Sequence, residues 1–210
     1  MAVTRTLLTG ALMATLLCPV APGVALQVRD MAAETTSAAW VEPGSGVTRR
    51  FWVRDKHRYT SPWYAGAHRK MIAFGCTRAP YYPPSSRCSR DRGFHHGLDL
   101  AMPCGTRLFA GMGGVVLRPS APGSLGSAYG RKAFRIRNHR HQVDIVIGHV
   151  RRVYVAPGER VRRGQLIARA SDAAAPDGCH LHFEVRPAGG SYTDAVRPTD
   201  YLRLQRSKVN

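Results

Sequence analysis

Seven short apolar runs, separated by glycine, proline and aspartate, follow one another from about residue 70 to the C-terminal region: "MIAF", "TRLFA", "GGVVLR", "AFRIR", "HQVDIVIG", "QLIAR" and "HLHFEV". Each run has the length of a β-strand and is short for a helix. No stretch shows the apolar repeat of an amphipathic helix. We therefore predict a mostly β protein with a single antiparallel β-sheet domain over residues 69–205, which the segment "TDAVRPTDYLRL" closes.

The N-terminal part of the chain lacks this repeated pattern of strand-sized apolar runs. Residues 1–25 place Arg5 ahead of an apolar run that ends in small residues at Ala25, the pattern of a secretory signal peptide. Lipidation of Cys18 is the alternative, but the residues beside it suit that processing poorly. Residues 26–68 mix small and polar residues without a period and are expected to form an irregular arm. No other stretch is apolar and long enough to span a bilayer, so we expect a secreted protein without a stable membrane span.

The chain is strongly basic, with a formal net charge of +18. Such a charge favours polyanionic partners, and for an exported protein these are cell-wall polymers and anionic membrane surfaces. Nucleic acid is the other usual partner of a basic protein. We exclude it because no nucleic-acid-binding motif is present and a signal peptide directs the chain out of the cell.

Four cysteines remain once the signal peptide, with its one cysteine, is removed. An even number of cysteines in an exported chain favours disulfides. Three pairings are possible, and we expect Cys76 with Cys88, which closes a short loop, and Cys104 with Cys179, which lie beside two histidine motifs. A zinc site made of four cysteines is the alternative, although its usual C-x2-C spacing is absent.

The segment "HLHFEV" places two histidines one residue apart on a predicted strand. Because successive side chains of a strand point to opposite faces, His180, His182 and Glu184 share one face. Leu181 and Phe183 point the other way and are expected in the core. A solvated face of an edge strand would explain this pattern, and so would a buried polar row that binds a metal.

A second histidine cluster, "GFHHGLDLAMPCGT", separates His95 and Asp99 by four positions. We interpret Gly97 between them as a bend that lets the two side chains converge. Imidazole nitrogen and carboxylate oxygen are both zinc ligands, and a catalytic zinc commonly has three protein ligands and one open position. His95, Asp99 and one histidine of "HLH" would supply the three ligands. His149, in "DIVIGHVRRV", reads on its own as a surface residue at a strand end.

Taken together, "HHGLD", "IGHV" and "HLHFEVR", joined by "PCGTRLFAGMGGVV" and "VAPGERVRRGQLIA", resemble the lysostaphin-type zinc metallopeptidases of peptidoglycan over about residues 93–202. The resemblance implies that the zinc ligands are His95, Asp99 and His182. It implies that His180 and His149 flank the open position and assist catalysis. Departures from the family pattern, such as Cys179 before the H-x-H motif, remove none of these residues.

The resemblance implies a secreted, cell-wall-associated zinc endopeptidase that cuts peptide stems or cross-bridges of peptidoglycan, with Zn²⁺ as cofactor. Two alternatives remain: a catalytically inactive wall-binding or hydrolase-activating module of the same fold, and a zinc D-Ala-D-Ala peptidase of another fold. No H-E-x-x-H helix is present, so Glu184 is expected to orient a histidine or pair with an arginine. We expect peptidoglycan and anionic wall polymers as partners, and a monomer.

Overall fold

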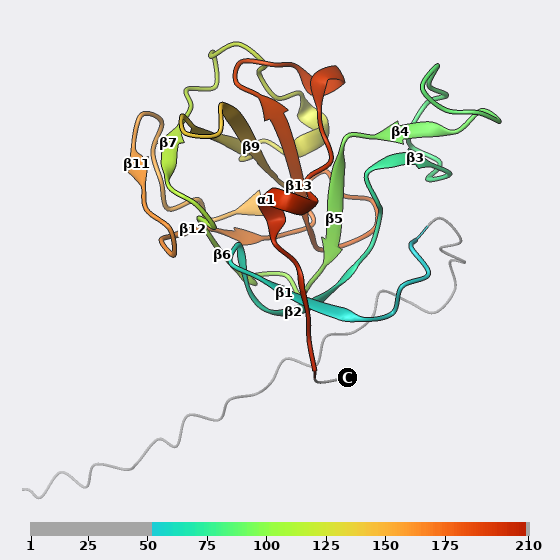
Figure 1. Cartoon of the computed structure of the whole chain (residues 1–210), viewed down its shortest axis with the longest axis horizontal. Coiled ribbons are helices and arrows are strands. Elements are labelled where there is room, and N and C mark those ends of the chain that lie inside the picture. Colours follow the sequence, from blue (N-terminus) through green and yellow to red (C-terminus); the bar gives the residue numbers. More distant parts are fainter. Residues whose placement is uncertain (1–51, 209–210) are drawn as a thin grey trace, which may run out of the picture. The chain divides into compact units, whose positions relative to one another are not determined.

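The computed structural model describes residues 52–208, and these residues are mainly β-structure (Figure 1). The expected signal peptide and residues 26–51 of the expected arm lie outside this part of the chain. The strands are β1 Arg58–Ser61, β2 Tyr64–Lys70, β3 Gly75–Thr77, β4 Gly93–His95, β5 Gly97–Ala101, β6 Arg107–Phe109, β7 Gly114–Val116, β8 Phe134–Asn138, β9 Val143–Gly148, β10 Val150–Arg151, β11 Arg160–Val161, β12 Leu166–Ala170, β13 His180–Pro187 and β14 Gln205–Arg206. The helical elements are short: the 3-10 turns η1 Ser127–Tyr129 and η2 Tyr192–Asp194, and the helix α1 Thr199–Leu202. Among the described residues, no helix is long and apolar enough to cross a membrane.

Twelve of the strands form one sheet, in the order β10-β12-β6-β2-β5-β13-β9-β8-β7-β11, with β1 beside β2 and β14 beside β1. Neighbouring strands of this sheet pair antiparallel, which confirms the predicted fold class. The strand β13 lies between β5 and β9 (Figure 1). A separate two-stranded sheet, β3-β4, was not expected from the sequence.

Six of the seven apolar runs coincide with strands to within two residues at either end, namely β6, β7, β8, β9, β12 and β13. The prediction is wrong for "MIAF", which connects β2 to β3 without being a strand. Met71 and Ile72 are nevertheless buried, in a second apolar cluster with Ala79 and Ala101. Their apolar character therefore reflects burial rather than strand pairing.

The expected boundary between arm and domain at residue 69 needs correction. Residues 58–61 form β1, and β2 begins at Tyr64 and pairs with β5 and β6. Trp63, which was assigned to the arm, is 0% exposed, and its ring centroid lies 4.9 Å from that of Phe183 in the core. Its indole N–H donates to the Tyr201 carbonyl at 2.8 Å. The folded domain thus includes aromatic residues that precede the repeated strand pattern.

The two faces of β13 alternate as predicted. Leu181, Phe183 and Val185 are fully buried in the main core. The polar face is also buried, because His180, His182, Glu184 and Arg186 are each no more than 5% exposed. The interpretation as a solvated edge face is therefore wrong, and these polar groups need partners.

Both expected disulfides are present. Cys76 and Cys88, whose Cα atoms lie 5.6 Å apart, link β3 to the loop that precedes β4. Cys104 and Cys179, with a Cα–Cα distance of 5.2 Å, link the turn after β5 to the residue before His180. A zinc site of four cysteines is therefore ruled out.

We expect Trp63→Ala to lower the free energy of unfolding by about 3–5 kcal/mol, because it removes a fully buried indole and leaves a cavity. Denaturant unfolding followed by circular dichroism measures this change. Val196→Ala is a suitable control, because Val196 is 41% exposed and its loss should change stability by less than about 0.5 kcal/mol. A similar loss of stability in both variants would contradict the assignment of Trp63 to the core.

Candidate metal centre

Three donor atoms from β4, β5 and β13 meet beside the main core. Antiparallel pairing places His182 directly opposite Asp99, and His95 ends β4. The His182 Nδ1 atom lies 2.9 Å from Asp99 Oδ1 and 3.1 Å from His95 Nε2. His95 Nε2 is 3.3 Å from Asp99 Oδ1. All three side chains are buried.

These spacings fit a tetrahedral zinc ion. Bonds of about 2.0–2.1 Å to zinc place neighbouring ligand atoms roughly 3.3 Å apart, close to the separations found here. Two imidazole nitrogens and one carboxylate oxygen are also a ligand set that zinc accepts. His95, Asp99 and His182 can therefore hold the metal without rearrangement of the backbone.

The electrostatics of the site favour a cation. Burial would raise the pKa of Asp99, but its interactions with the imidazoles of His95 and His180 and its hydrogen bond with His182 hold it well below the ordinary value, so the carboxylate is ionised. Burial alone would lower the pKa of His182, yet Asp99 and Glu184 raise it to about 9. The same negative charges that attract a proton to this ring attract a metal ion.

The remote nitrogen of each candidate histidine ligand is hydrogen-bonded. His95 Nδ1 lies 3.0 Å from the carbonyl oxygen of Ala73, and His182 Nε2 lies 3.1 Å from Glu184 Oε2. When these nitrogens donate, the nitrogens that face each other carry lone pairs, which is the tautomer a metal requires. Glu184 contacts both a histidine and an arginine, as expected, since Arg186 Nε donates to its other oxygen.

His149 and His180 form a pair beside the three donors. Their ring centroids lie 4.4 Å apart, and His180 Nε2 is 3.8 Å from Asp99 Oδ2. Each Nδ1 atom is hydrogen-bonded to a backbone carbonyl, at 2.7 Å to Ala173 and at 2.8 Å to Gly178. Both Nε2 atoms are therefore left as proton acceptors.

Burial, together with repulsion from any proton on His180 or His182, lowers the pKa of His149 to about 3. Burial also lowers the pKa of His180. Both rings are therefore neutral near pH 7. Because the two rings are in contact, a proton on one disfavours a proton on the other.

His149 is buried, in contrast to the surface position expected from its local sequence. Its φ of 54° is in the left-handed region, which few residues other than glycine adopt. Its backbone N–H donates to the Tyr129 carbonyl at 2.8 Å, and its own carbonyl accepts from the N–H of Ser171 at 2.8 Å. These two bonds fix the turn between β9 and β10 that presents the ring to His180.

Gly97 has a different role from the expected bend. It lies in the extended strand β5, and a Cβ atom at this position would lie 2.6 Å from His182 Cε1 and 2.8 Å from the Phe183 carbonyl oxygen. Both distances are too short for a real contact. The position requires glycine because the His182 ring occupies the space of a side chain.

Two tyrosines beside the site were not anticipated from the sequence. Tyr129, in η1, donates its hydroxyl to Glu184 at 2.9 Å, and its ring centroid lies 5.3 Å from that of His182. The ring of Tyr82 lies 5.4 Å from that of His95. Neither tyrosine belongs to a recognisable motif, so no local signal distinguishes them from other surface aromatics.

The long loop before η1 is held by two buried arginines, Arg135 and Arg186. Arg135 donates to the carbonyls of Ala121 and Pro122. Arg186 donates to the carbonyl of Gly123 at 2.8 Å and to the Tyr129 hydroxyl at 2.9 Å. The loop is thereby tied to the same polar network that orients His182.

The model of peptidase family M23 matches residues 93–195, a range that contains both the three donors and the histidine pair. The chain carries a peptidase family M23 domain. The resemblance to lysostaphin-type metallopeptidases is confirmed, and the alternative of a zinc peptidase of another fold is wrong.

Several solved structures share the fold of this M23 domain. LytU superposes with a TM-score of 0.52 at 26% identity, over 64% of this chain and 83% of the LytU chain. The catalytic domain of the antimicrobial peptidase lysostaphin from Staphylococcus simulans gives 0.50 at 23% identity, over 65% and 92%. A longer lysostaphin chain gives 0.53 at 21% identity, over 70% of this chain and 55% of its own length.

Proposed function

We propose that this M23 domain is a secreted zinc metalloendopeptidase that hydrolyses peptide bonds in peptidoglycan stems or cross-bridges. In this proposal His95, Asp99 and His182 are the zinc ligands, and His180 and His149 are catalytic. The observation that carries it is the convergence of three zinc-type donor atoms next to two neutral histidines with free Nε2 atoms.

Zinc bound at this site would polarise a peptide carbonyl and lower the pKa of a water molecule to about 7. Histidines of the chain would then transfer the proton of this water molecule. An Nε2 atom of the His149–His180 pair accepts it from the attacking water, and the imidazolium delivers it to the leaving amine. The Nδ1 hydrogen bonds to Ala173 and Gly178 keep both rings oriented for this transfer.

Several observations support peptidoglycan as the substrate and secretion as the destination of the protein. Lysostaphin, which shares the fold, is an antimicrobial peptidase, and the motif resemblance points to peptidoglycan. The expected signal peptide and the two disulfides agree with an oxidising, extracellular compartment. The net charge of +18 suits an enzyme that works among anionic wall polymers.

The alternative is a catalytically inactive module of the same fold, which would bind the wall or activate another hydrolase. This chain retains all five candidate residues, and their side chains lie close together. That retention favours the enzyme over the inactive module.

We expect the purified protein to bind about one zinc ion and to lose hydrolysis when a chelator removes it. The measurement is metal analysis, combined with mass spectrometry of fragments released from purified walls of known composition. Zinc returned after chelation should restore the same fragments. Full activity of a zinc-free preparation would overturn the proposal, whereas stoichiometric zinc without any released fragment would favour the inactive module.

Binding of the protein to cell walls should weaken roughly tenfold or more between about 0.1 and 1 M salt. Over this interval the Debye length, which sets the distance over which exposed charges interact, falls from about 10 to 3 Å. Sedimentation of the protein with insoluble walls measures this binding. Walls stripped of their anionic polymers provide the control, since they should bind less and show a weaker salt dependence. Binding that salt does not change would indicate recognition of a specific receptor group instead.

A further inference from the structure

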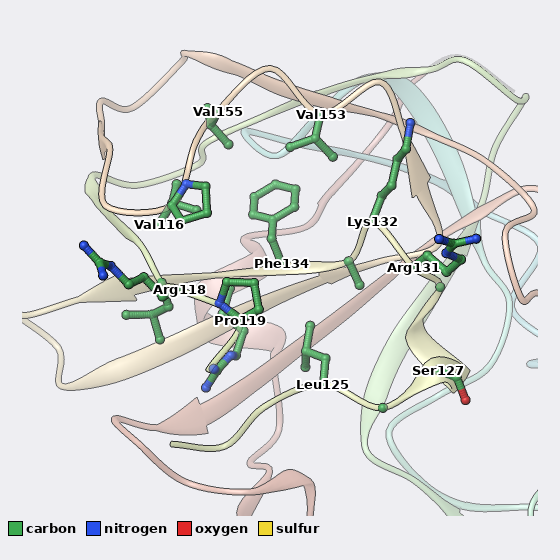
Figure 2. Close-up of a pocket in the computed structure, with 16 residues that line it drawn as sticks. Val116, Arg118, Pro119, Leu125, Ser127, Arg131, Lys132, Phe134, Val153 and Val155 are labelled. Atoms are coloured by element: carbon green, nitrogen blue, oxygen red, sulfur yellow. The ribbon is translucent and has the colours of Figure 1, made fainter. Parts of the chain in front are cut away.

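A cavity of about 360 Å³ lies beside η1, between the loop at residues 117–133, the start of β8 and the segment at 153–157 (Figure 2). None of the five candidate zinc and catalytic residues lines it. Ser127 and Gly130 face the cavity, while Tyr129 between them contacts Glu184 of the metal centre. The cavity is therefore a separate site that shares one wall element with the metal centre.

The interior of the cavity is apolar. Figure 2 shows the Phe134 ring in the middle, with Val153 and Val155 on one side and Leu125 on the other. Phe134, Val153 and Val155 also pack against the main core, so the core supports this wall of the cavity from behind. An apolar group that displaced water from these side chains would gain favourable burial.

Three cationic side chains, Arg118, Arg131 and Lys132, lie around the rim (Figure 2). All three are exposed, and no aspartate or glutamate is among the residues that line the cavity. Within residues 52–208, none of these three side chains makes an ion pair or a hydrogen bond. Arg135, which also lines the cavity, differs because it is held by Asp144 and two carbonyls.

We infer that this cavity binds an amphipathic anion, a single hydrocarbon chain or ring that ends in a phosphate or carboxylate. The apolar interior accounts for the hydrocarbon part, and the unpaired cations account for the anionic end. An inorganic anion would leave the apolar side chains of the interior in contact with water, and a neutral hydrocarbon would leave the cationic side chains without an anionic partner. The volume, near the lower end for ligand pockets, fits one chain rather than a two-chain lipid.

The test is isothermal titration of the full chain with dodecyl phosphate below its critical micelle concentration. We expect saturable binding of one molecule. Inorganic phosphate and dodecyl maltoside, which carry only one of the two features, should each bind at least about tenfold more weakly. Equal binding of either comparator would overturn the inference.

Variants localise the site. Arg131→Gln combined with Lys132→Gln should weaken dodecyl phosphate binding about tenfold or more, and Leu125→Ser should weaken it too, because all three residues line the cavity. Arg58→Gln combined with Arg206→Gln is the matched control: it removes the same charge at exposed positions on β1 and β14 and should change binding less than about twofold. Equal weakening by both charge pairs would show that overall charge, and not this cavity, binds the probe.

Discussion

Replacing His182 with alanine is expected to abolish zinc binding and peptide hydrolysis together, whereas replacing His180 with alanine should lower hydrolysis and leave zinc in place. His182 Nδ1 faces both Asp99 Oδ1 and His95 Nε2, so its loss removes one of three ligands. His180 stands 3.8 Å from the far oxygen of Asp99 and acts in our proposal on protons. Its loss should therefore lower turnover by about 10² to 10⁴ while zinc stays near one ion per chain.

The measurement compares metal content and hydrolysis rate for both variants prepared in parallel. His139→Ala is the control, because His139 is exposed and lies outside the candidate site. It should retain both zinc and activity. Complete zinc loss in the His180→Ala variant would show that both histidines of "HLH" are ligands and that the proposed division of roles is wrong.

The substitution Gly97→Ala, which changes no ligand, is expected to damage the metal centre nearly as much. Its new methyl group would meet the His182 ring at 2.6 Å and a backbone oxygen of β13 at 2.8 Å. The ring can move only by leaving its bonds to Asp99 and Glu184, and the oxygen belongs to a paired strand. We expect zinc affinity to fall about 10–100-fold and unfolding free energy to fall by about 1–3 kcal/mol.

Zinc titration and denaturant unfolding measure these two effects. Gly126→Ala is the matched control, because its φ of −79° is ordinary and a Cβ atom there meets nothing within 4 Å. This variant should keep its zinc affinity and stability. If Gly97→Ala binds zinc as tightly as the unchanged chain, the close approach of His182 to β5 is not needed for the site.

Much of the candidate site could be predicted from the sequence, because the patterns that indicate it lie within short segments of the chain. Strand alternation placed His180 and His182 on one face, since side chains of a strand repeat every two residues. The pairing of Cys104 with Cys179 followed from their positions beside the two histidine motifs, and the structure contains it.

Other features depend on contacts between residues far apart in the chain. Trp63 was assigned to the arm because its neighbours show no period, yet it packs on Phe183, 120 positions away. Tyr129 carries no motif, and only the approach of η1 to β13 brings it to Glu184.

The sequence by itself predicted an antiparallel sheet and placed His180, His182 and Glu184 on one face of β13, because short-range periodicity encodes these properties. Spacing suggested His95, Asp99 and one histidine of "HLH" as zinc ligands, and the choice of His182 came from the resemblance to a known family. Only the tertiary structure decided that the polar face is buried, that Gly97 makes room for His182 rather than bending the chain, and that Arg135 and Arg186 hold the loop before η1. Burial, close approach and hydrogen bonding across strands are properties of packed elements, and a local pattern does not specify which elements will pack together.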